Sequence, residues 1–576
     1  MIPLQKKPFN FNITEKFTVA EDTSYLADIA AMHSKLYKKI KLEVLEKMID
    51  DLSDSSSNTS SKQTDTLQKY LQKKISSAYK RDITSVLQSP GGAEQFVSDE
   101  YCKAFASCFD PHTEFFPLTE KENFESELGN EHFRFGFTIK EDDAGGVIIN
   151  GLEPGSPAFK CGLLNKGDKF KTLQWEGQSA IDVSDATAAS LIEIVSQSNH
   201  NRLIITVVKE DGTLRTVTLM KEQKAADDDT KVKSFVLKGA NTFGYISLPA
   251  FYSNWEDENT GDNGCANDVA KEILKLKKEN IQGLILDLRY NGGGSLQEAV
   301  EMAGIFIDAG PVMQIQQRSA EKIFTLKDVN RGTVYDGPLI ILVNGYSASA
   351  SEVLAGTLQD YNRALIVGSA TYGKATGQVV LPLDSSINSE SDTRNIKADN
   401  YLKVTDSKLF RVNGTSAQFS GVTPDIILPD LLQADPNREA DEPFALQPST
   451  IDANKYYKPY SPLQITTLQS EAKHEADTMK YFTYVKDYIH QYKLINTSED
   501  LPLSFKEMWA LEKADSLPVK PGFNYASTYN VANNDYDKQQ LTTITDSNDI
   551  NTAFINYLSH DAYIKICIDM LSLMAK

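Results

Sequence analysis

Three serines that alternate with alanine are the residues of this 576-residue chain whose spacing points most directly to chemistry. Ser347, Ser349 and Ser351 follow a short apolar run, 339–343, and lead into a segment with helical spacing that starts at Glu352. A serine at the junction of a strand and a helix lies beside the unpaired amides of the first helical turn. Acyl transfer uses this arrangement, because a nucleophilic hydroxyl needs donors for the oxyanion next to it.

The same segment also fits a structural role. Ser349 followed by Glu352 three residues later is the pattern of a capping box, in which the serine starts a helix and does no chemistry. The two interpretations are compatible, since a nucleophile can also be the first residue of a helix. The serines alone therefore leave a helix cap and a nucleophile open.

A serine nucleophile needs a base, and Lys374 is the nearby candidate because no histidine lies within residues 337–378. Lys374 follows Gly373 and a second apolar run, 364–367, which we expect to be a buried strand. Burial disfavours the charged form of lysine. Lowering the lysine pKa from about 10.4 to near 7 takes roughly 4–5 kcal/mol of differential solvation. The alternative is an ordinary lysine in an exposed loop.

The elements that position these residues follow from the flanking sequence. We predict a strand at 339–343, a helix at 352–361 and a strand at 364–367. Upstream, residues 282–289 predict another buried strand, which ends in the glycine loop Asn-Gly-Gly-Gly at 291–294. Three glycines after a strand could cradle a phosphate, but the lysine and the Ser/Thr of a nucleotide-binding loop are absent.

The segment 347–378 resembles the C-terminal processing peptidases, which are also called tail-specific proteases. The matching residues are Ser347 to Glu352, Gln359, Asp360, Arg363, Ala364, Gly373, Lys374 and Gln378. The resemblance implies that Ser349 is the nucleophile, that Lys374 is its base and that Gln378 orients the lysine. It is strong over residues 100–430 and weaker outside them.

The glycine loop gains a role from the same resemblance. It implies an oxyanion hole that is made by the amide of Gly292 or Gly293 together with the amide of Ala350. The loss of one such donor typically lowers the rate by about 10²–10³.

The charged residues near the site have supporting roles in this interpretation. We expect Asp287 to pair with Arg289 and to hold the glycine loop. We expect Asp360 to pair with Arg363 in the same way, and a supporting role of Asp360 at the site stays open.

Residues 130–225 alternate between polar and apolar residues as strands do, with glycines between the runs. The segments that resemble a PDZ domain are Phe133 to Phe137, Gly155 to Ala158 and Lys166 to Asp168. A PDZ domain adds a peptide C-terminus as a strand and binds its carboxylate with backbone amides. The resemblance places those donors at Phe135, Gly136 and Phe137, and the other wall of the groove in a helix at 186–196. Phe-Gly-Phe on its own is more often a bulged strand.

These patterns together predict a multidomain α+β chain. We expect a helical N-terminal region at 1–129, a β-sandwich-like PDZ domain at 130–225, a crotonase/ClpP-like α/β protease core at 226–432 and a helical C-terminal region at 433–576. The helical regions are expected to frame the path of the substrate or to bind a partner, such as an adaptor protein.

Composition argues against several classes of function. The net charge of −20 disfavours nucleic acid, which binds basic patches. The five cysteines form no CxxC pair and the seven histidines no HExxH pattern, so we expect no metal, and the chemistry needs no nucleotide or other cofactor. No apolar run is long enough for a membrane-spanning helix, and the first ten residues lack the apolar segment of a signal peptide.

The whole sequence predicts a serine endopeptidase with a Ser-Lys dyad. Its partners would be proteins or peptides with free, apolar C-termini, and the resemblance implies a periplasmic or otherwise extracytoplasmic setting. The alternative is a non-catalytic PDZ scaffold on an inactive protease core, against which Ser349, Lys374 and Gln378 together argue. A crotonase-like enzyme that acts on acyl thioesters is a third option, against which the PDZ-like segment argues.

Overall fold

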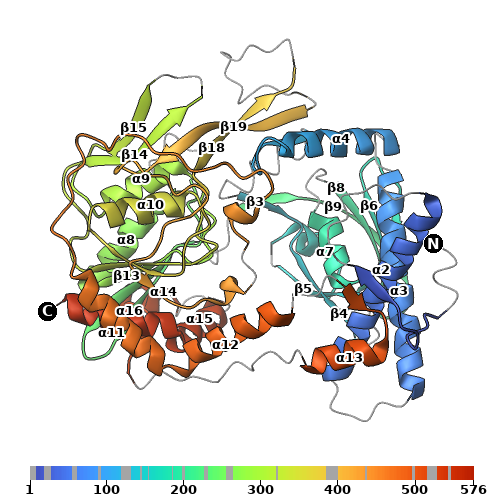
Figure 1. Cartoon of the computed structure of the whole chain (residues 1–576). Coiled ribbons are helices and arrows are strands. Elements are labelled where there is room, and N and C mark those ends of the chain that lie inside the picture. Colours follow the sequence, from blue (N-terminus) through green and yellow to red (C-terminus); the bar gives the residue numbers. More distant parts are fainter. Residues whose placement is uncertain are drawn as a thin grey trace. The chain divides into compact units, whose positions relative to one another are not determined.

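The computed structural model (Figure 1) describes residues 8–18, 28–54, 61–87, 92–117, 131–142, 146–153, 155–184, 186–196, 202–225, 231–253, 264–318, 322–384, 398, 400–434, 437–495, 500–514, 528–541 and 547–575. The chain divides into two compact units that interleave along the sequence. The first unit contains Met1–Tyr101, Phe133–Lys224 and Gln491–Leu517, and the second contains Cys102–His132, Ala225–His490 and Pro518–Lys576. The predicted protease core therefore shares a unit with most of the C-terminal region.

A seven-stranded sheet forms the centre of the second unit, in the order β20-β17-β16-β13-β12-β11-β22. Its strands are β11 (Lys233–Lys238), β12 (Thr242–Ser247), β13 (Leu284–Asp287), β16 (Leu339–Val343), β17 (Leu365–Gly368), β20 (Ile426–Ile427) and β22 (Asn530–Ala532). The strands from β12 to β20 run parallel, and β11 is antiparallel to both neighbours. The three predicted buried strands are confirmed as β13, β16 and β17, each of which is buried along its whole length.

Helices cover both faces of this sheet, as parallel strands with two apolar faces require. They are α8 (Gly264–Lys278), α9 (Leu296–Gly304) and α10 (Ala350–Asp360) on one face, and α11 (Ile465–Thr478), α15 (Ser547–Ser559) and α16 (Ala562–Met574) on the other (Figure 1). In β16, Ile341 belongs to the core under the first group, whereas Ile340 and Leu342 belong to the core under the second. Successive residues of a strand point to opposite faces, which explains this division.

A second sheet carries the segment that follows Lys374. Its strands are β2 (Glu114–Pro117), β14 (Gly310–Gln317), β15 (Ile323–Asp328), β18 (Thr376–Pro382) and β19 (Asn400–Phe410), in the order β15-β14-β19-β18 with β2 paired to β19. Thr357 of α10 donates a hydrogen bond to the Val312 carbonyl of β14 (2.8 Å). This bond joins the second sheet to the helix that begins at Ser349.

The C-terminal region is helical as predicted, but it also supplies strands. Its further helices are α12 (Lys480–Ile495), α13 (Phe505–Ala514) and α14 (Asp535–Leu541). The strand β22 pairs with β11, where Val531 lies opposite Leu237. Both residues belong to the core of the central sheet, so β22 covers an apolar edge that short sequence patterns do not reveal.

The first unit contains a strand-rich part and a helical part. The strand-rich part has a six-stranded sheet made of β4 (Phe137–Glu141), β5 (Val147–Leu152), β6 (Lys169–Trp175), β7 (Ile181–Asp182), β8 (Arg202–Val208) and β9 (Leu214–Met220), with the helices α6 (Pro157–Lys160) and α7 (Ala188–Ser196). β4 is the edge strand, next to β5. Two short strands pair with each other: β3 (Glu131–Arg134), which precedes this sheet in the sequence, and β10 (Glu222–Ala225), which follows it.

The predicted helices of the N-terminal region are confirmed. They are α2 (Ile29–Asp54), α3 (Ser61–Leu87) and α4 (Gly92–Ser107), and a short strand, β1 (Lys16–Thr18), pairs with β21 (Asp500–Pro502). Leu45 of α2, Leu71 of α3 and Leu503 next to β21 lie in one buried cluster, so residues from both ends of the chain stabilise this part. Among the helices that are described, none has the length and apolarity needed to cross a bilayer.

Candidate active site

Ser349 lies at the start of α10, directly after the turn that leaves β16. Its φ of 54° and ψ of −112° place a non-glycine residue in a strained region of the backbone map. The Ser349 amide donates to Oε2 of Glu352 (2.9 Å), which is one half of the predicted capping box, while the hydroxyl makes no capping hydrogen bond. The helix start therefore uses the backbone of Ser349 and leaves its hydroxyl available.

The carboxylate of Glu352 connects the serine turn to the loop that carries the lysine. It is 2% exposed, and it accepts hydrogen bonds from the amides of Ser349 (2.9 Å), Gly373 (2.7 Å) and Lys374 (2.9 Å) and from the Thr371 hydroxyl (2.6 Å). Burial raises the pKa of Glu352 to about 7, against the effect of these four donors. From the sequence, Glu352 was predicted only as part of a helix cap. The one sequence signal for a larger role was its position between the serines and Gly373-Lys374.

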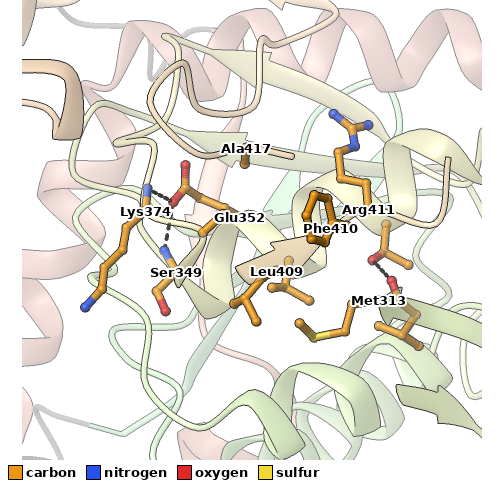
Figure 2. Close-up of a pocket in the computed structure, with 12 residues that line it drawn as sticks. Met313, Ser349, Glu352, Lys374, Leu409, Phe410, Arg411 and Ala417 are labelled. Atoms are coloured by element: carbon orange, nitrogen blue, oxygen red, sulfur yellow. Dashed lines mark hydrogen bonds between the residues drawn. The ribbon is translucent and has the colours of Figure 1, made fainter. Parts of the chain in front are cut away.

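Lys374 is half-buried and lines the same cavity as Ser349. Its pKa lies below the ordinary lysine value, first because burial disfavours the charged amine and second because the Lys403 charge repels it. In Figure 2, dashed lines join Glu352 to the two backbone amides, and the side chains of Ser349 and Lys374 both extend away from it. Within the described part of the chain, no hydrogen bond joins Nζ of Lys374 to the Ser349 hydroxyl.

Gln378 lies on β18 and does not bond Lys374 among the contacts of the described residues. Its Nε2 donates to the hydroxyls of Thr376 (3.0 Å) and Thr405 (3.2 Å). The Thr405 hydroxyl in turn donates to Asp110 (2.8 Å). These hydrogen bonds join Gln378 to β18 and β19 and do not involve Lys374. The orienting role of Gln378 stays a prediction.

The glycine loop after β13 packs against the serine turn. A Cβ on Gly293 would lie 2.8 Å from the Cβ of Ser349 and 3.1 Å from the nitrogen of Ala350, so only glycine permits this approach. The Asn291 carbonyl accepts a hydrogen bond from the Ser351 hydroxyl (2.9 Å), which fixes the loop to the first turn of α10.

The three predicted oxyanion donors differ in their partners. The Gly293 amide donates to Oδ1 of Asn291 (2.9 Å). The amides of Gly292 and Ala350 have no acceptor among the residues that the structure describes. These two amides are available as they stand, whereas the Gly293 amide has to leave Asn291 before it can donate to a substrate.

Asp360 pairs with Arg411 and not with Arg363, so the predicted Asp360–Arg363 pair is wrong. Arg411 donates to both carboxylate oxygens of Asp360 (3.0 and 2.5 Å), and Asn413 adds a third bond (2.8 Å). The helix ends at Asp360, and Asn362 has a φ of 54°, so the chain turns away before Arg363. Arg363 instead donates to two backbone carbonyls. Asp360 touches the cavity only through Arg411.

The predicted pair of Asp287 and Arg289 is confirmed at the end of β13. Arg289 donates to Oδ2 of Asp287 (2.7 Å) and also to Oδ2 of Asp561 (2.8 Å). Asp561 starts α16, where it accepts the amides of the first helical turn. The strand end that leads into the glycine loop is therefore tied to the C-terminal helix.

In the first unit, Phe135, Gly136 and Phe137 form a tight loop before and at the start of β4. The carbonyl of Gly136 accepts bonds from the Glu153 amide (2.9 Å) and the Ser156 hydroxyl (3.1 Å). The amides of Phe135 and Gly136 have no acceptor in the described part of this unit. A carboxylate oxygen of Glu141 on β4 accepts the Ala188 amide at the start of α7 (3.0 Å), so strand and helix are joined.

An apolar cavity opens beside Ser349, between α10 on one side and β14 and β19 on the other (Figure 2). Its lining residues are Val312, Met313, Ser349, Glu352, Val353, Thr357, Lys374, Ala375, Leu409, Phe410, Arg411 and Ala417. The cavity volume of about 20 Å³ is that of a space for one or two small groups.

The site thus brings together a hydroxyl, an amine of lowered pKa, two available amides and an apolar cavity. These are the parts that acyl transfer through a serine requires. Among the described residues, no group of three or more His, Cys, Asp or Glu side chains could hold a metal ion.

Two family descriptions match this chain. Residues 242–428 match peptidase family S41, and residues 1–118 match the tail-specific protease N-terminal domain. The chain contains a peptidase S41 domain at residues 242–428. Ser349, Lys374 and Gln378 all lie within the S41 match, so the geometry described above is that of an S41 domain.

The curated relatives of this chain carry protease names. The tail-specific protease of Haemophilus influenzae is 31% identical over 391 residues, which cover 67% of this chain and 53% of that protein. The carboxy-terminal-processing protease of Bartonella bacilliformis is 27% identical over 327 residues, which cover 55% of this chain and 66% of that protein. The chain therefore spans less than two thirds of the length of these relatives. Among solved structures, the photosystem II D1 C-terminal processing protease aligns over 68% of this chain and 93% of that one, with 23% identity and a TM-score of 0.34.

Proposed function

We propose that this protein is a serine endopeptidase in which Ser349 is the nucleophile and Lys374 is the general base. One observation carries the proposal: Ser349 and a half-buried Lys374 line one apolar cavity, and the Glu352 carboxylate bonds the backbone amides of both. The lowered pKa of Lys374 adds support, because a neutral amine can accept the serine proton.

In the first half of the reaction, the neutral Lys374 amine takes the proton of the Ser349 hydroxyl. The serine oxygen attacks the carbonyl carbon of the scissile peptide bond, and the negative charge develops on the carbonyl oxygen. The amides of Ala350 and of Gly292 or Gly293 donate hydrogen bonds to that oxygen. The carbon–nitrogen bond then breaks, the leaving amine takes the proton from Lys374, and an ester joins the substrate to Ser349.

In the second half, water replaces the leaving amine. Lys374 is again neutral, so it takes a proton from water while the water oxygen attacks the ester carbonyl. The bond to the Ser349 oxygen breaks, and that oxygen recovers a proton from Lys374. The products are two peptides and the unchanged enzyme. Gln378 and Asp360 act as supports in this scheme, Gln378 through the strand after Lys374 and Asp360 through Arg411.

We further propose that the strand-rich part of the first unit is a PDZ domain that binds the free C-terminus of a substrate. The edge strand β4 offers an unpaired side on which an extended peptide can add as a strand. The amides of Phe135, Gly136 and Phe137 would bind the terminal carboxylate, and α7 would form the other wall of the groove. An apolar terminal side chain is expected between them. The family resemblance supports an extracytoplasmic, periplasmic setting and leaves room for an adaptor protein on the helical parts.

The test uses an unfolded protein with an apolar C-terminal tail and a matched protein with an acidic tail. The wild-type enzyme should cleave the first faster, and both Ser349→Ala and Lys374→Ala should abolish cleavage. A fluorophosphonate should label the wild-type enzyme at Ser349. If both variants cleave as fast as the wild type, the dyad is wrong. If the wild type neither cleaves nor becomes labelled but binds the apolar tail, the chain is the non-catalytic scaffold.

A further inference from the structure

Two tyrosine rings are exposed at the segments that lead into the site. Tyr290 is 62% exposed and Tyr346 is 41% exposed. Their ring centroids lie 6.0 Å apart with an interplanar angle of 33°, so the rings contact each other. Two exposed rings in contact form one apolar surface, which is a feature of binding sites more than of ordinary protein surface.

The backbone fixes both tyrosines to the framework of the site. Tyr290 lies two residues before Gly292, and Tyr346 lies three residues before Ser349. The side-chain oxygen of Asn344 accepts the amides of both Tyr290 (2.9 Å) and Tyr346 (3.1 Å). Asn344 is 2% exposed, so one buried side chain joins the backbones of the two tyrosines.

The backbone conformation of Tyr290 is unusual for a residue with a bulky ring. Its φ of 63° lies in the left-handed region, where a bulky side chain is strained and glycine or asparagine is favoured. Strained residues cluster at functional sites, because the surrounding structure stabilises them there. Neither tyrosine lines the cavity beside Ser349, so the surface of the two rings is separate from that cavity.

We propose that Tyr290 and Tyr346 bind side chains of the substrate polypeptide that flank the residue in the cavity. The chemistry selects extended chains with apolar or aromatic side chains close to the scissile bond, since these stack on exposed rings. This inference rests on the proposed function, because the ligand is the substrate of the same site. It adds a specificity element that the sequence patterns did not single out.

The test measures binding and turnover separately. In a Ser349→Ala background, the affinity for a fluorescent unfolded polypeptide is compared with and without the double change Tyr290→Ala and Tyr346→Ala. We expect the double change to weaken binding about tenfold. The matched double change to Phe keeps both rings and should restore most of the affinity. Tyr456→Ala, at a residue that is 84% exposed and lies outside the site, should leave binding unchanged.

Active enzymes supply the second readout. In the double alanine variant, the KM for peptides with an aromatic residue near the scissile bond should rise. The rate of fluorophosphonate labelling should fall by a smaller factor. Equal peptide affinity with and without the rings overturns the proposal. An equal loss of affinity, peptide hydrolysis and labelling also overturns it, because it shows that the rings only support the fold. Should the wild type fail to hydrolyse any peptide, the binding comparison still decides this inference, so its failure is distinguishable from failure of the dyad.

Discussion

Replacement of Glu352 tests whether one buried carboxylate holds the proposed nucleophile Ser349 and the proposed base Lys374 in place. Oε2 accepts the amides of Ser349 and Lys374, and Oε1 accepts the Gly373 amide and the Thr371 hydroxyl. Glutamine has the same shape, but one of its terminal groups is an NH₂ that cannot accept a hydrogen bond. We expect the NH₂ to face Thr371, whose hydroxyl can rotate to accept it, so that only the Gly373 amide loses its partner.

The expected size of the effect follows from this geometry. One lost hydrogen bond to a carboxylate costs about 1.5–3 kcal/mol. Removal of the charge offsets part of that cost, since the rise of the Glu352 pKa from 4.5 to about 7 corresponds to about 3 kcal/mol. For Glu352→Gln we therefore expect a change in the free energy of unfolding within about 2 kcal/mol and a rate loss of about tenfold. Glu352→Leu removes all four bonds, and its rate should fall by about 10² or more.

The pH dependence separates positioning from general support of the fold. Protonation of Glu352 removes an acceptor as glutamine does, so activity should fall as the pH drops through about 7. If Lys374 is the base, activity should also fall when Lys374 becomes protonated, and its pKa lies below the ordinary lysine value. With two such groups, the logarithm of kcat/KM should rise with pH more steeply near pH 7 than the slope of about 1 that Lys374 alone gives, whereas Glu352→Gln should leave a slope of about 1.

The assay is hydrolysis of a fluorogenic unfolded polypeptide from about pH 5.5 to 9.5, with thermal unfolding recorded for each variant. The matched control is Glu471→Gln, which removes an exposed carboxylate of α11 and should change neither slope nor rate. The reasoning is refuted if wild type and Glu352→Gln give the same slope, or if Glu352→Leu keeps full activity while folded.

Three further predictions concern the proposed base, the cavity and the proposed tail-binding loop. In Lys374→Arg the side chain stays protonated and cannot act as a base, so kcat measured on peptides should fall by about 10²–10⁴ at every pH. A variant that regains activity at high pH would contradict this. Ala417→Leu fills part of the small cavity, and cleavage sites mapped by mass spectrometry should shift toward glycine and alanine before the scissile bond; an unchanged site preference would show that this cavity does not receive that side chain. In Gly136→Val the Cβ would lie 2.0 Å from the Cβ of Ser156, so the loop must distort and the preference for an apolar over an acidic tail should disappear; a preserved preference would exclude this loop as the binding site.

Local patterns predicted the parts of the site that neighbours in sequence define. The two strands and the helix predicted around Ser349 correspond to β16, β17 and α10. They were predictable because apolar runs and a capping pattern involve only a few neighbouring residues. The same patterns could not predict that Glu352 also binds the loop that carries Lys374. Three of its four donors lie at Thr371, Gly373 and Lys374, and they reach the carboxylate only after β17 has reversed the direction of the chain.

Pairings over long sequence separations could not be predicted from spacing. The short separation of Asp360 and Arg363 suggested a local pair, but the actual partner of Asp360 is Arg411, which follows β19. Arg411 comes within reach because β19 pairs with β14, and β14 packs against α10. The tyrosine surface has the same origin, since Tyr290 and Tyr346 belong to different strand ends that the parallel pairing of β13 and β16 brings together.

The C-terminal helices pack on the sheet of the S41 domain, although the S41 match ends at residue 428. A parallel sheet with two apolar faces needs cover on both, and α11 and α16 cover the face that presents Ile285, Ile340 and Leu342. Asp561 at the start of α16 also pairs with Arg289, which is bonded to Asp287 just before the glycine loop. Without these helices, Arg289 would lose one of its two carboxylates and the loop would lose part of its anchor. The geometry at Ser349 therefore depends on residues more than 200 positions further along the chain.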